Sequence, residues 1–581
     1  MDKIKEPQQL YGHPIGLYVL FFTEMWERFS YYGMRAILVL FIYSSIEDGG
    51  LGWTKGEALE LYGWYTMLVY VMSIPGGILA DKMLGQKKTV MLGGLLLCIG
   101  HGILAVQATW AFYTGLGLIV LGVGCLKPNI STMVGGLYKQ GDDRRDKGFT
   151  IFYIGINIGA FLAAIIVGYV GENIGWHYGF GLAGIGMIIG QLVYVWGQKH
   201  LVGIGDYLGT SSAANQELMK KPLSKIEWDR MIVLFISFLI IIVFWGAFEQ
   251  AGGLLNIYAK EKTNLTIGLL GTDVPASWFQ SVNALFIILF GTSVAAYWVS
   301  RKTKGKEVSS LFKMAIGTII MGLGFLLMAG ASNQAGGEAY GKASMMWLIG
   351  AYFLHTIGEL CASPVALSFI TKLAPVKYGA IMMGVYFAAT GLGNKLAGTI
   401  GEASQAESVE IGLTAAPNAV RPFLESDSLI INDKDFILKA NIYKENGQIV
   451  MINNQEGTKQ DFSKFISLES KAKGILDQML IDEEATQNNQ KHVILRFSKD
   501  TEAKKIKSNK GDGKDYSGTA EIFEVQNKRE MKTFIFITIL TVVFGLLVLL
   551  FLKRLKRLTH GAEELKEVEN TDEAEGFELA D

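Results

Sequence analysis

The sequence predicts an all-α membrane protein with twelve spanning helices and one small α/β domain inserted before the last helix. Three observations predict it. Half of the 581 residues are hydrophobic and only 18% are charged, whereas soluble domains carry about 25% charged residues. Apolar stretches long enough to cross a bilayer recur along the chain. A single long polar segment, 403–529, interrupts them near the C-terminus.

The overall composition narrows the class of protein further. A net charge of −1 lacks the basic excess of proteins that bind nucleic acids, so we expect no nucleic-acid partner. The three cysteines all lie in apolar stretches, which suits small core residues and not a disulfide framework or a metal site. We therefore expect no metal and no cofactor. The 69 glycines fit helices that pack closely in lipid.

Each apolar stretch is a candidate spanning helix, because crossing the hydrocarbon core takes about 20 apolar residues. The polar residues before the first stretch lack the charged and apolar regions of a cleaved signal, so the first helix is expected to act as its own insertion signal. We expect the twelve helices at 15–44, 54–80, 88–107, 109–136, 149–171, 176–198, 229–259, 276–300, 309–331, 344–372, 377–402 and 531–552.

Lysine and arginine are unevenly distributed between the loops, and this predicts the orientation. Basic residues gather in every second loop, for example at Lys82, Lys87 and Lys88, and again after the last helix at Lys553 and Arg554. The loops between them are short and almost free of basic residues. Because cytoplasmic loops carry the excess of Lys and Arg, we expect both termini in the cytoplasm and a multi-pass protein of the plasma (inner) membrane.

The polar segment is predicted to fold as a small domain outside the cytoplasm. Asn446-Gly447 between alternating apolar residues predicts a β-hairpin. A helix is predicted at 462–480, with strands at 492–498 and 519–526. The predicted order is a six-helix bundle at 1–198, a cytoplasmic linker at 199–228, helices seven to eleven at 229–402, the α/β domain at 403–529, helix twelve at 530–555 and an acidic cytoplasmic tail at 556–581.

The first predicted helix carries four ionisable side chains inside its apolar run. A charged residue near the middle of a bilayer costs about 2.5–3.5 kcal/mol on insertion scales. Such residues are tolerated where they face a protein interior or a wet cavity and pair with one another. The charged residues and two tyrosines recur at helical spacing and so share one face. They are Glu24, Glu27, Arg28, Tyr31, Tyr32 and Arg35.

Other predicted helices carry further buried charges. Lys127 lies in the fourth helix, Glu249 in the seventh and Glu359 in the tenth. The basic residues therefore lie in the first six helices, whereas Glu249 and Glu359 lie in the last six. A cavity between the halves would be positive on one wall and negative on the other, which suits a zwitterion, and a buried glutamate could also carry a proton. The alternative is a purely structural ion pair between helices.

Five stretches resemble, in order, motifs of the proton-dependent oligopeptide transporter (POT/PTR) family of the major facilitator superfamily. The resemblance covers all twelve predicted helices and leaves out 403–529. It implies the twelve-helix major facilitator fold, two six-helix bundles, and proton-coupled import of di- and tripeptides across the lipid bilayer. The stretches are EMWERFSYYG at 24–33, GILADKMLGQKK at 77–88, FYIGINIG at 152–159, FWGAFEQ at 244–250 and GELCASP at 358–364.

The resemblance also implies roles for individual residues. Glu24, Glu27 and Arg28 would couple transport to protons. Arg35, Lys127 and Glu249 would form a gating salt bridge between the halves. The peptide carboxylate would be held by Arg28, Lys127, Tyr31, Tyr70 and Asn157, the amino group by Glu359 with Asn283, and the side chains by Tyr32, Tyr153, Trp278 and Ser363, with Arg35 also at the substrate site.

The sequence departs from the family pattern at two places that bear on function. Asn283 is followed by Ala284 where the family often has proline, and the polar domain lies between helices eleven and twelve, so no role or partner transfers to it. The first alternative to a peptide symporter is a related proton-coupled carrier for another small anion or peptide-like compound. A membrane enzyme or a receptor are further alternatives, but the sequence contains neither GxSxG nor HExxH, so we expect no enzyme.

Overall fold

The computed structural model divides into two compact units, which are described separately. The membrane unit comprises Met1–Ala335, Gly341–Ser404 and Met531–Asp581, and the second unit comprises Gly336–Tyr340 and Gln405–Glu530. Part of the predicted linker and most of the predicted acidic tail lie outside the described residues. Those described are 9–46, 48–138, 142, 144–206, 223–267, 271–335, 342–375, 378–405, 409–415, 435–453, 459–462, 466–467, 470–480, 491–498, 516–524 and 528–562.

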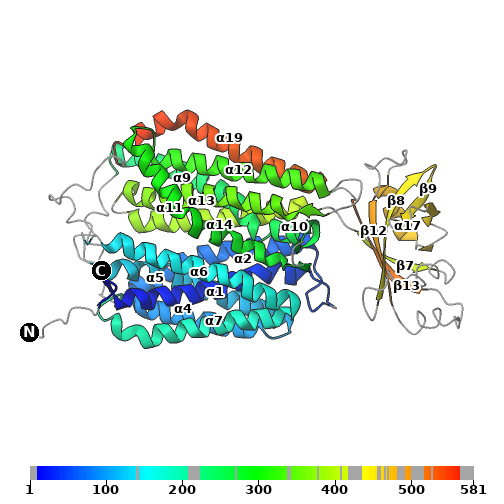
Figure 1. Ribbon diagram of the computed structural model, residues 1–581, viewed down its shortest axis with the longest axis horizontal. Coiled ribbons are helices and arrows are strands. Elements are labelled where there is room, and N and C mark those ends of the chain that lie inside the picture. Colours follow the sequence, from blue (N-terminus) through cyan, green and yellow to red (C-terminus); the bar gives the residue numbers. More distant parts are fainter. Residues whose placement is uncertain are drawn as a thin grey trace, which may run out of the picture. The chain divides into compact units, whose positions relative to one another are not determined.

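Twelve long helical segments, six in each half, run side by side in the membrane unit (Figure 1). The first half contains α1 (Ile15–Tyr43), α2 (Lys55–Val71) continued by α3 (Ser73–Leu79) and η1 (Ala80–Leu84), α4 (Gln86–Leu104), α5 (Thr109–Gly136), α6 (Arg144–Asn173) and α7 (Trp176–Gly197). The second half contains α9 (Lys225–Phe248) continued by η3 (Glu249–Ala251) and α10 (Leu254–Lys262), η4 (Ala276–Trp278) continued by α11 (Phe279–Thr303), α12 (Ser310–Ala335), α13 (Met345–Leu373), α14 (Gly379–Ser404) and α19 (Lys528–Leu558).

Every predicted spanning helix overlaps one of these twelve segments. Among the described residues, ten segments are long and apolar enough to cross a membrane by length and composition alone. The four charged residues of α1 keep it out of that group. The all-α membrane fold predicted from the sequence is confirmed.

The seventh helix differs from its prediction as one continuous span at 229–259. It is interrupted after α9 by the 3₁₀ turn η3, and it resumes as α10. Gly252 and Gly253 follow the turn, and Gly253 takes a φ of −106° and a ψ of −101°, a conformation that glycine adopts without steric cost. The interruption lies at Glu249, the acidic residue that the sequence places in this helix.

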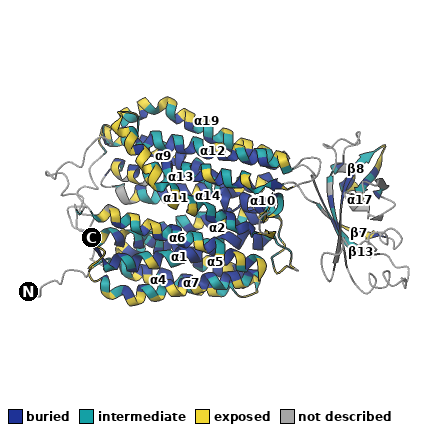
Figure 2. Cartoon of the chain, viewed as in Figure 1, coloured by how far each residue is buried: buried dark blue, intermediate teal, exposed yellow. Residues whose placement is uncertain are grey.

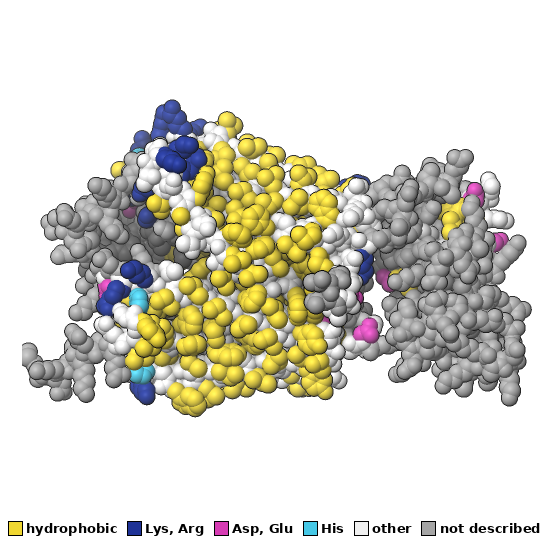
Figure 3. Space-filling model, viewed as in Figure 1, with side chains coloured by type: hydrophobic (Ala, Val, Ile, Leu, Met, Phe, Trp, Pro, Cys, Tyr) yellow, Lys and Arg dark blue, Asp and Glu magenta, His cyan; other side chains and the backbone are white. Residues whose placement is uncertain are grey.

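The surface of the membrane unit is mostly apolar and its interior carries the polar residues that matter for function. Figure 2 shows exposed residues along the outer faces of the helices, and these include large apolar side chains such as Leu550 and Trp196. Figure 3 shows a broad hydrophobic surface with lysine and arginine gathered mainly at one end. Such a surface fits contact with lipid along the bundle and with an aqueous, anionic boundary at the basic end.

The second unit contains a seven-stranded antiparallel sheet and the short helix α17 (Ser470–Met479). The strand order is β10-β9-β8-β12-β13-β7-β11. The bounds are β7 (Val409–Ala415), β8 (Asp435–Glu445), β9 (Gln448–Asn453), β10 (Lys459–Asp461), β11 (Ile466–Ser467), β12 (Lys491–Ser498) and β13 (Tyr516–Glu524).

The predicted hairpin in this unit is confirmed, and the predicted helix is partly wrong. β8 and β9 pair up to Glu445 and Gln448, and Asn446 and Gly447 take φ values of 52° and 74°, as a tight two-residue turn requires. The helix expected at 462–480 is shorter, because Ile466 pairs with Ala415 as part of strand β11. Pairing with β7 has overridden the helical tendency of this stretch.

Candidate functional site

The charged cluster on α1 is buried and self-paired. Arg28 Nε lies 3.0 Å from Glu24 Oε1 and also contacts the carboxylate of Glu27. Glu24 and Arg28 are each only 3% exposed, and Glu27 is 0% exposed. Glu24 and Arg28 are one helical turn apart, so α1 itself brings them together. Two acids thus share one guanidinium in a site closed to bulk solvent.

The neighbouring helix α6 packs tightly against this cluster. A Cβ added at Gly159 would lie 2.2 Å from the carbonyl oxygen of Met25 and 3.1 Å from Cβ of Arg28, so only glycine allows the close approach. Asn157, two residues earlier, donates from Nδ2 to the carbonyl oxygen of Tyr153 at 2.9 Å. The FYIGINIG stretch therefore forms the wall beside Arg28.

Aromatic rings cover the basic side chains. The guanidinium carbon of Arg28 lies 5.6 Å from the ring centre of Tyr31 and 5.9 Å from that of Tyr32. Lys127 of α5 places Nζ 3.7 Å from the ring centre of Tyr70 on α2. Cation–π contacts of this kind stabilise a desolvated cation without neutralising it. The aromatic rings therefore leave the charge of Lys127 available to a ligand, whereas the guanidinium of Arg28 is engaged by Glu24 and Glu27.

The opposite half supplies an acidic site. Glu359 of α13 is 8% exposed and accepts a hydrogen bond at 2.9 Å from Nδ2 of Asn283 on α11. The same amide lies 3.0 Å from the hydroxyl of Thr356. Asn283 therefore reaches its predicted partner without a following proline. Ser363 lies one turn beyond Glu359 on the same helix and is half-buried.

Two tyrosines lie within electrostatic range of residues from both halves of the bundle. Tyr70 lies within electrostatic range of both Arg28 and Glu359. Tyr153 lies within range of both Tyr32 and Glu359, and its side chain is 38% exposed. The charged residues within electrostatic range of Glu359 itself are Arg35 of the first half and Glu249 of the second.

A second ion pair joins the halves directly. Arg35 Nη1 lies 2.9 Å from Glu249 Oε1, and Tyr62 donates its hydroxyl to the same oxygen at 2.5 Å. A Cβ at Gly252 would lie 1.9 Å from the Tyr62 hydroxyl, so the break in the seventh helix makes room for this junction. Lys127, predicted as a third member of this salt bridge, instead lies against Tyr70 and in electrostatic range of Glu24 and Glu27.

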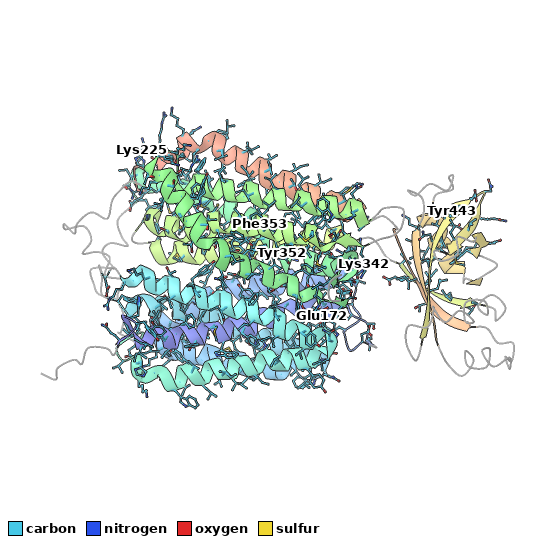
Figure 4. The ribbon with its side chains drawn as sticks, in the orientation of Figure 1. Glu172, Lys225, Lys342, Tyr352, Phe353 and Tyr443 are labelled. Atoms are coloured by element: carbon cyan, nitrogen blue, oxygen red, sulfur yellow. The ribbon has the colours of Figure 1, made fainter. Side chains whose placement is uncertain are left out.

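Further contacts between the halves lie at one end of the bundle. Glu172, at the end of α6, accepts from Lys260 Nζ and from the backbone N–H of Ser277, both at 2.8 Å. Lys55 pairs with Glu261 at 2.8 Å. Figure 4 places Glu172 at the end of the membrane unit opposite to Lys225. These contacts hold α10 and η4 against the first half.

Trp278, predicted to line a side-chain pocket, makes a hydrogen bond to the neighbouring half of the bundle. Its indole Nε1 donates to the carbonyl oxygen of Ile165 at 3.0 Å and so ties η4 to α6. Tyr62, Glu172 and Lys260 were missed by the sequence reasoning. Each lies near a helix end or on a face with no other charge, so only the folded contacts distinguish them from ordinary surface or core residues.

Among the residues that the structure describes, no group of three or more His, Cys, Asp or Glu side chains could hold a metal ion. Buried ion pairs, tyrosines and a broken helix at the boundary of two six-helix bundles together define a membrane transporter of the major facilitator type.

The comparisons with known proteins give the family. The model of the POT family matches residues 87–206 and 205–414. The chain is 34% identical over 461 residues to Peptide transporter YePEPT of Yersinia enterocolitica, covering 69% of this chain and 90% of that protein. It is 36% identical over 445 residues to the Di-/tripeptide transporter of Lactococcus lactis subsp. cremoris, covering 66% and 88%.

The comparison with solved structures also finds a peptide transporter. A mutant of peptide transporter POT in complex with alafosfalin is 29% identical, with a TM-score of 0.68, and covers 95% of this chain and 97% of that chain. The chain belongs to the POT family, whose members are transporters and not enzymes.

Proposed function

We propose that this protein imports di- and tripeptides together with protons, by alternating access between two six-helix halves. The relatives named above as peptide transporters support the substrate class. The observation that carries the proposal is buried charge of opposite sign in the two halves, with Arg28 and Lys127 in the first half and Glu359, held by Asn283, in the second. A short peptide is a zwitterion that matches both charges.

The peptide is held by its two ends. Arg28 and Lys127, with Tyr31, Tyr70 and Asn157, bind the carboxylate, because charge-assisted hydrogen bonds are the strongest available in a dry site. Glu359 binds the ammonium group and Asn283 fixes its orientation. Tyr32, Tyr153 and Ser363 line the space for side chains, whereas Trp278 supports that space through its bond to α6. Contacts to the peptide ends leave the side chains free to vary.

Proton coupling resides in the α1 cluster. Glu24 and Glu27 compete for Arg28, and both carboxyl groups are buried. When one of them takes up a proton, its attraction to the guanidinium falls and Arg28 turns to the peptide carboxylate. An inward gradient then drives accumulation, since each proton gains about 2.3 kcal/mol per 100 mV of membrane potential.

Three ion pairs support a state that is closed at the end of the bundle proposed to face the outside. The pairs Lys55–Glu261 and Glu172–Lys260, with the Arg35–Glu249 junction deeper in the bundle, hold the halves together at the end away from the basic loops. The basic end faces the cytoplasm, as do both termini, because it carries the lysines and arginines that the positive-inside rule requires there. The charge pattern of the loops also predicts that the polar segment 403–529 lies outside the cytoplasm, and no partner is assigned to it.

Uptake of labelled dialanine into proteoliposomes tests the coupling role. The Glu27→Gln variant should lose accumulation driven by a proton gradient and keep exchange of labelled for unlabelled peptide. Glu57→Gln, which changes an exposed acid on α2, is the matched control and should behave like the wild type. Equal uphill accumulation by Glu27→Gln would defeat the coupling proposal.

A carrier for a simple anion is the remaining alternative, and Glu359 argues against it because an anion offers no ammonium group. Competition by N-acetylated dialanine separates the two. A peptide carrier that uses Glu359 should discriminate strongly against the acetylated compound, and Glu359→Gln should reduce this discrimination. An anion carrier should accept both compounds about equally.

A further inference from the structure

A lateral groove of about 590 Å³ lies between α11, α12 and α13. Its floor is formed by Ile357 and Cys361 of α13. Each of these lies two residues from Glu359, so it points about 200° around the helix from that glutamate. The groove is therefore on the far side of α13 from the proposed peptide site.

The walls of the groove are apolar and belong to the lipid-facing part of the bundle. Phe290 of α11 faces Ile316 and Ile320 of α12 across it. Phe353 of α13, labelled in Figure 4, packs on Phe290 with ring centres 5.3 Å apart. On the outer side, Tyr297 is 56% exposed. These walls offer an acyl chain the apolar surroundings that it has in the bilayer.

One end of the groove is polar and basic. Arg301 lines it, with its guanidinium carbon 5.0 Å from the ring centre of Phe312 and its Nε donating to the carbonyl oxygen of Glu307 at 2.8 Å. Lys313 places Nζ 5.4 Å from the ring centre of Trp298. The backbone of the loop thus fixes Arg301 at the mouth of the groove, while most of its N–H donors remain for a ligand.

The indole N–H of Trp298 is a second donor at this end. Trp298 is 9% exposed and lines the groove, and among the described residues no oxygen or nitrogen accepts a hydrogen bond from its Nε1. Its polar neighbour is the thiol of Cys361, which is a weak acceptor. A buried indole N–H usually has a partner, so a ligand oxygen would satisfy it.

The charge around the mouth of the groove determines whether a cationic or an anionic ligand is favoured. Between positions 301 and 313 the sequence contains five basic residues and one acid, Glu307. The carboxylate of Glu307 is already engaged by Lys556 Nζ at 3.0 Å and by the backbone N–H of Ser309 at 2.8 Å. The remaining field is positive, which attracts the head groups of anionic lipids.

We propose that this groove binds one anionic phospholipid, with an acyl chain along Phe290, Ile316 and Ile320 and the phosphate at Arg301 and Trp298. A free phosphate would leave the apolar walls unused, and a neutral lipid would not exploit the basic mouth. The site is independent of peptide recognition, since its residues lie on the opposite side of α13.

Photo-cross-linking with full-length protein in phosphatidylcholine nanodiscs tests this site. A phosphatidylglycerol with a diazirine in its acyl chain should label peptides from α11, α12 and α13, as mapped by mass spectrometry. Unlabelled phosphatidylglycerol should compete and added phosphatidylcholine should not. Arg301→Gln should reduce labelling of these peptides about fivefold, the effect of one basic side chain near an anionic lipid.

Two further variants keep the test decisive. Lys302→Gln removes the same charge from an exposed neighbour that adds to the positive field but does not line the groove, so it should reduce labelling less than Arg301→Gln does, by about twofold or less. Ile316→Trp fills the groove without changing its charge and should abolish labelling, provided that gel filtration shows a monodisperse protein. The proposal is overturned if phosphatidylcholine competes equally, if labelling spreads evenly over the lipid-facing helices, or if Arg301→Gln and Lys302→Gln act alike.

Discussion

Arg28 and Arg35 lie two turns apart on one face of α1, yet they form different kinds of ion pair. Arg28 pairs with Glu24 and Glu27 of its own helix. Arg35 pairs with Glu249, which belongs to the other half of the bundle. Both arginines contact the ring of Tyr32, at 5.9 Å and 4.9 Å, so one tyrosine lies between the two systems.

Under the proposed mechanism, the Arg28 cluster is the site of protonation and the Arg35–Glu249 pair is a contact that breaks when the halves separate. The Arg28 cluster can change its protonation without moving the halves, because every ionic partner described for it lies on α1. The Arg35 pair cannot survive if the halves separate at this level. Breaking either is costly, since removing one member of a buried pair typically costs about 3–5 kcal/mol. Tyr32 offers a route by which loss of one pair is felt at the other.

The largest expected effect comes from Arg28→Gln. Losing a charged partner for the peptide carboxylate removes about 1.5–3 kcal/mol of binding free energy, so the affinity for dialanine should fall roughly 10- to 150-fold. Uptake should fall at least as much if, as proposed, the same residue also serves proton coupling. Equilibrium binding in detergent and uptake in proteoliposomes measure the two effects separately.

Arg28→Lys is the matched control for charge. It keeps the cation but loses the planar fork that can contact two oxygens, so it should bind dialanine with intermediate affinity. If Arg28→Lys and Arg28→Gln bind dialanine as tightly as the wild type, Arg28 does not hold the peptide. The proposed difference in role between Arg28 and Arg35 would then lack its support from peptide binding.

The second prediction concerns the junction between the halves. Arg35→Gln and Glu249→Gln should each open the outer end, because each leaves a buried charge without its partner. The double variant should open it less than the two single effects combined, with a coupling free energy of about 0.5–3 kcal/mol. Leu255→Cys in α10, a fully buried position, reports opening through labelling by an impermeant maleimide in a cysteine-free background.

Tyr62→Phe is the milder variant at the same junction. It removes one hydrogen bond of 2.5 Å to Glu249 and leaves the ion pair, so the shift should be about 1 kcal/mol or less. Additive effects of Arg35→Gln and Glu249→Gln on labelling would show that the pair does not hold the outer end closed.

The sequence could predict the residues of both pairs but not how they combine. The four charges of α1 stand out because charge inside an apolar run is costly, and helical spacing places them on one face. Spacing cannot show which partner comes from another helix, so it does not reveal Tyr62. The grouping of Lys127 with Glu249 came from the family resemblance, and in the structure Lys127 lies against Tyr70. The break after Glu249 also depends on packing around Gly252, which a hydropathy pattern does not contain.

The second unit also contains one feature that the sequence could predict and one that it could not. Its hairpin turn was predictable because Asn446-Gly447 specifies a local backbone conformation. The short strand β11 was not, because its pairing with β7 joins residues about fifty positions apart in the sequence. Local signals were reliable where local geometry decides the structure and failed where tertiary pairing decides it.

The smallest predicted effect concerns an ion pair outside the membrane, which contrasts with both buried ones. Glu307 lies between α11 and α12 and pairs with Lys556 at 3.0 Å, with the two side chains 33% and 35% exposed. Burial raises the pKa of Glu307, but hydrogen bonds from Ser309 and Lys556 outweigh it and lower the pKa to about 2.

Because the folded state lowers this pKa from its ordinary value of 4.5, the pair contributes fully above about pH 4.5 and loses its contribution as the pH falls towards 2. Glu307→Gln should therefore destabilise the protein by about 0.2–1 kcal/mol near pH 6, as exposed pairs do. Thermal unfolding in detergent at several pH values measures the difference between variant and wild type. That difference should shrink between pH 5 and pH 3, and a difference that stays constant over this range would mean that the Glu307 carboxylate contributes by packing and not by its charge.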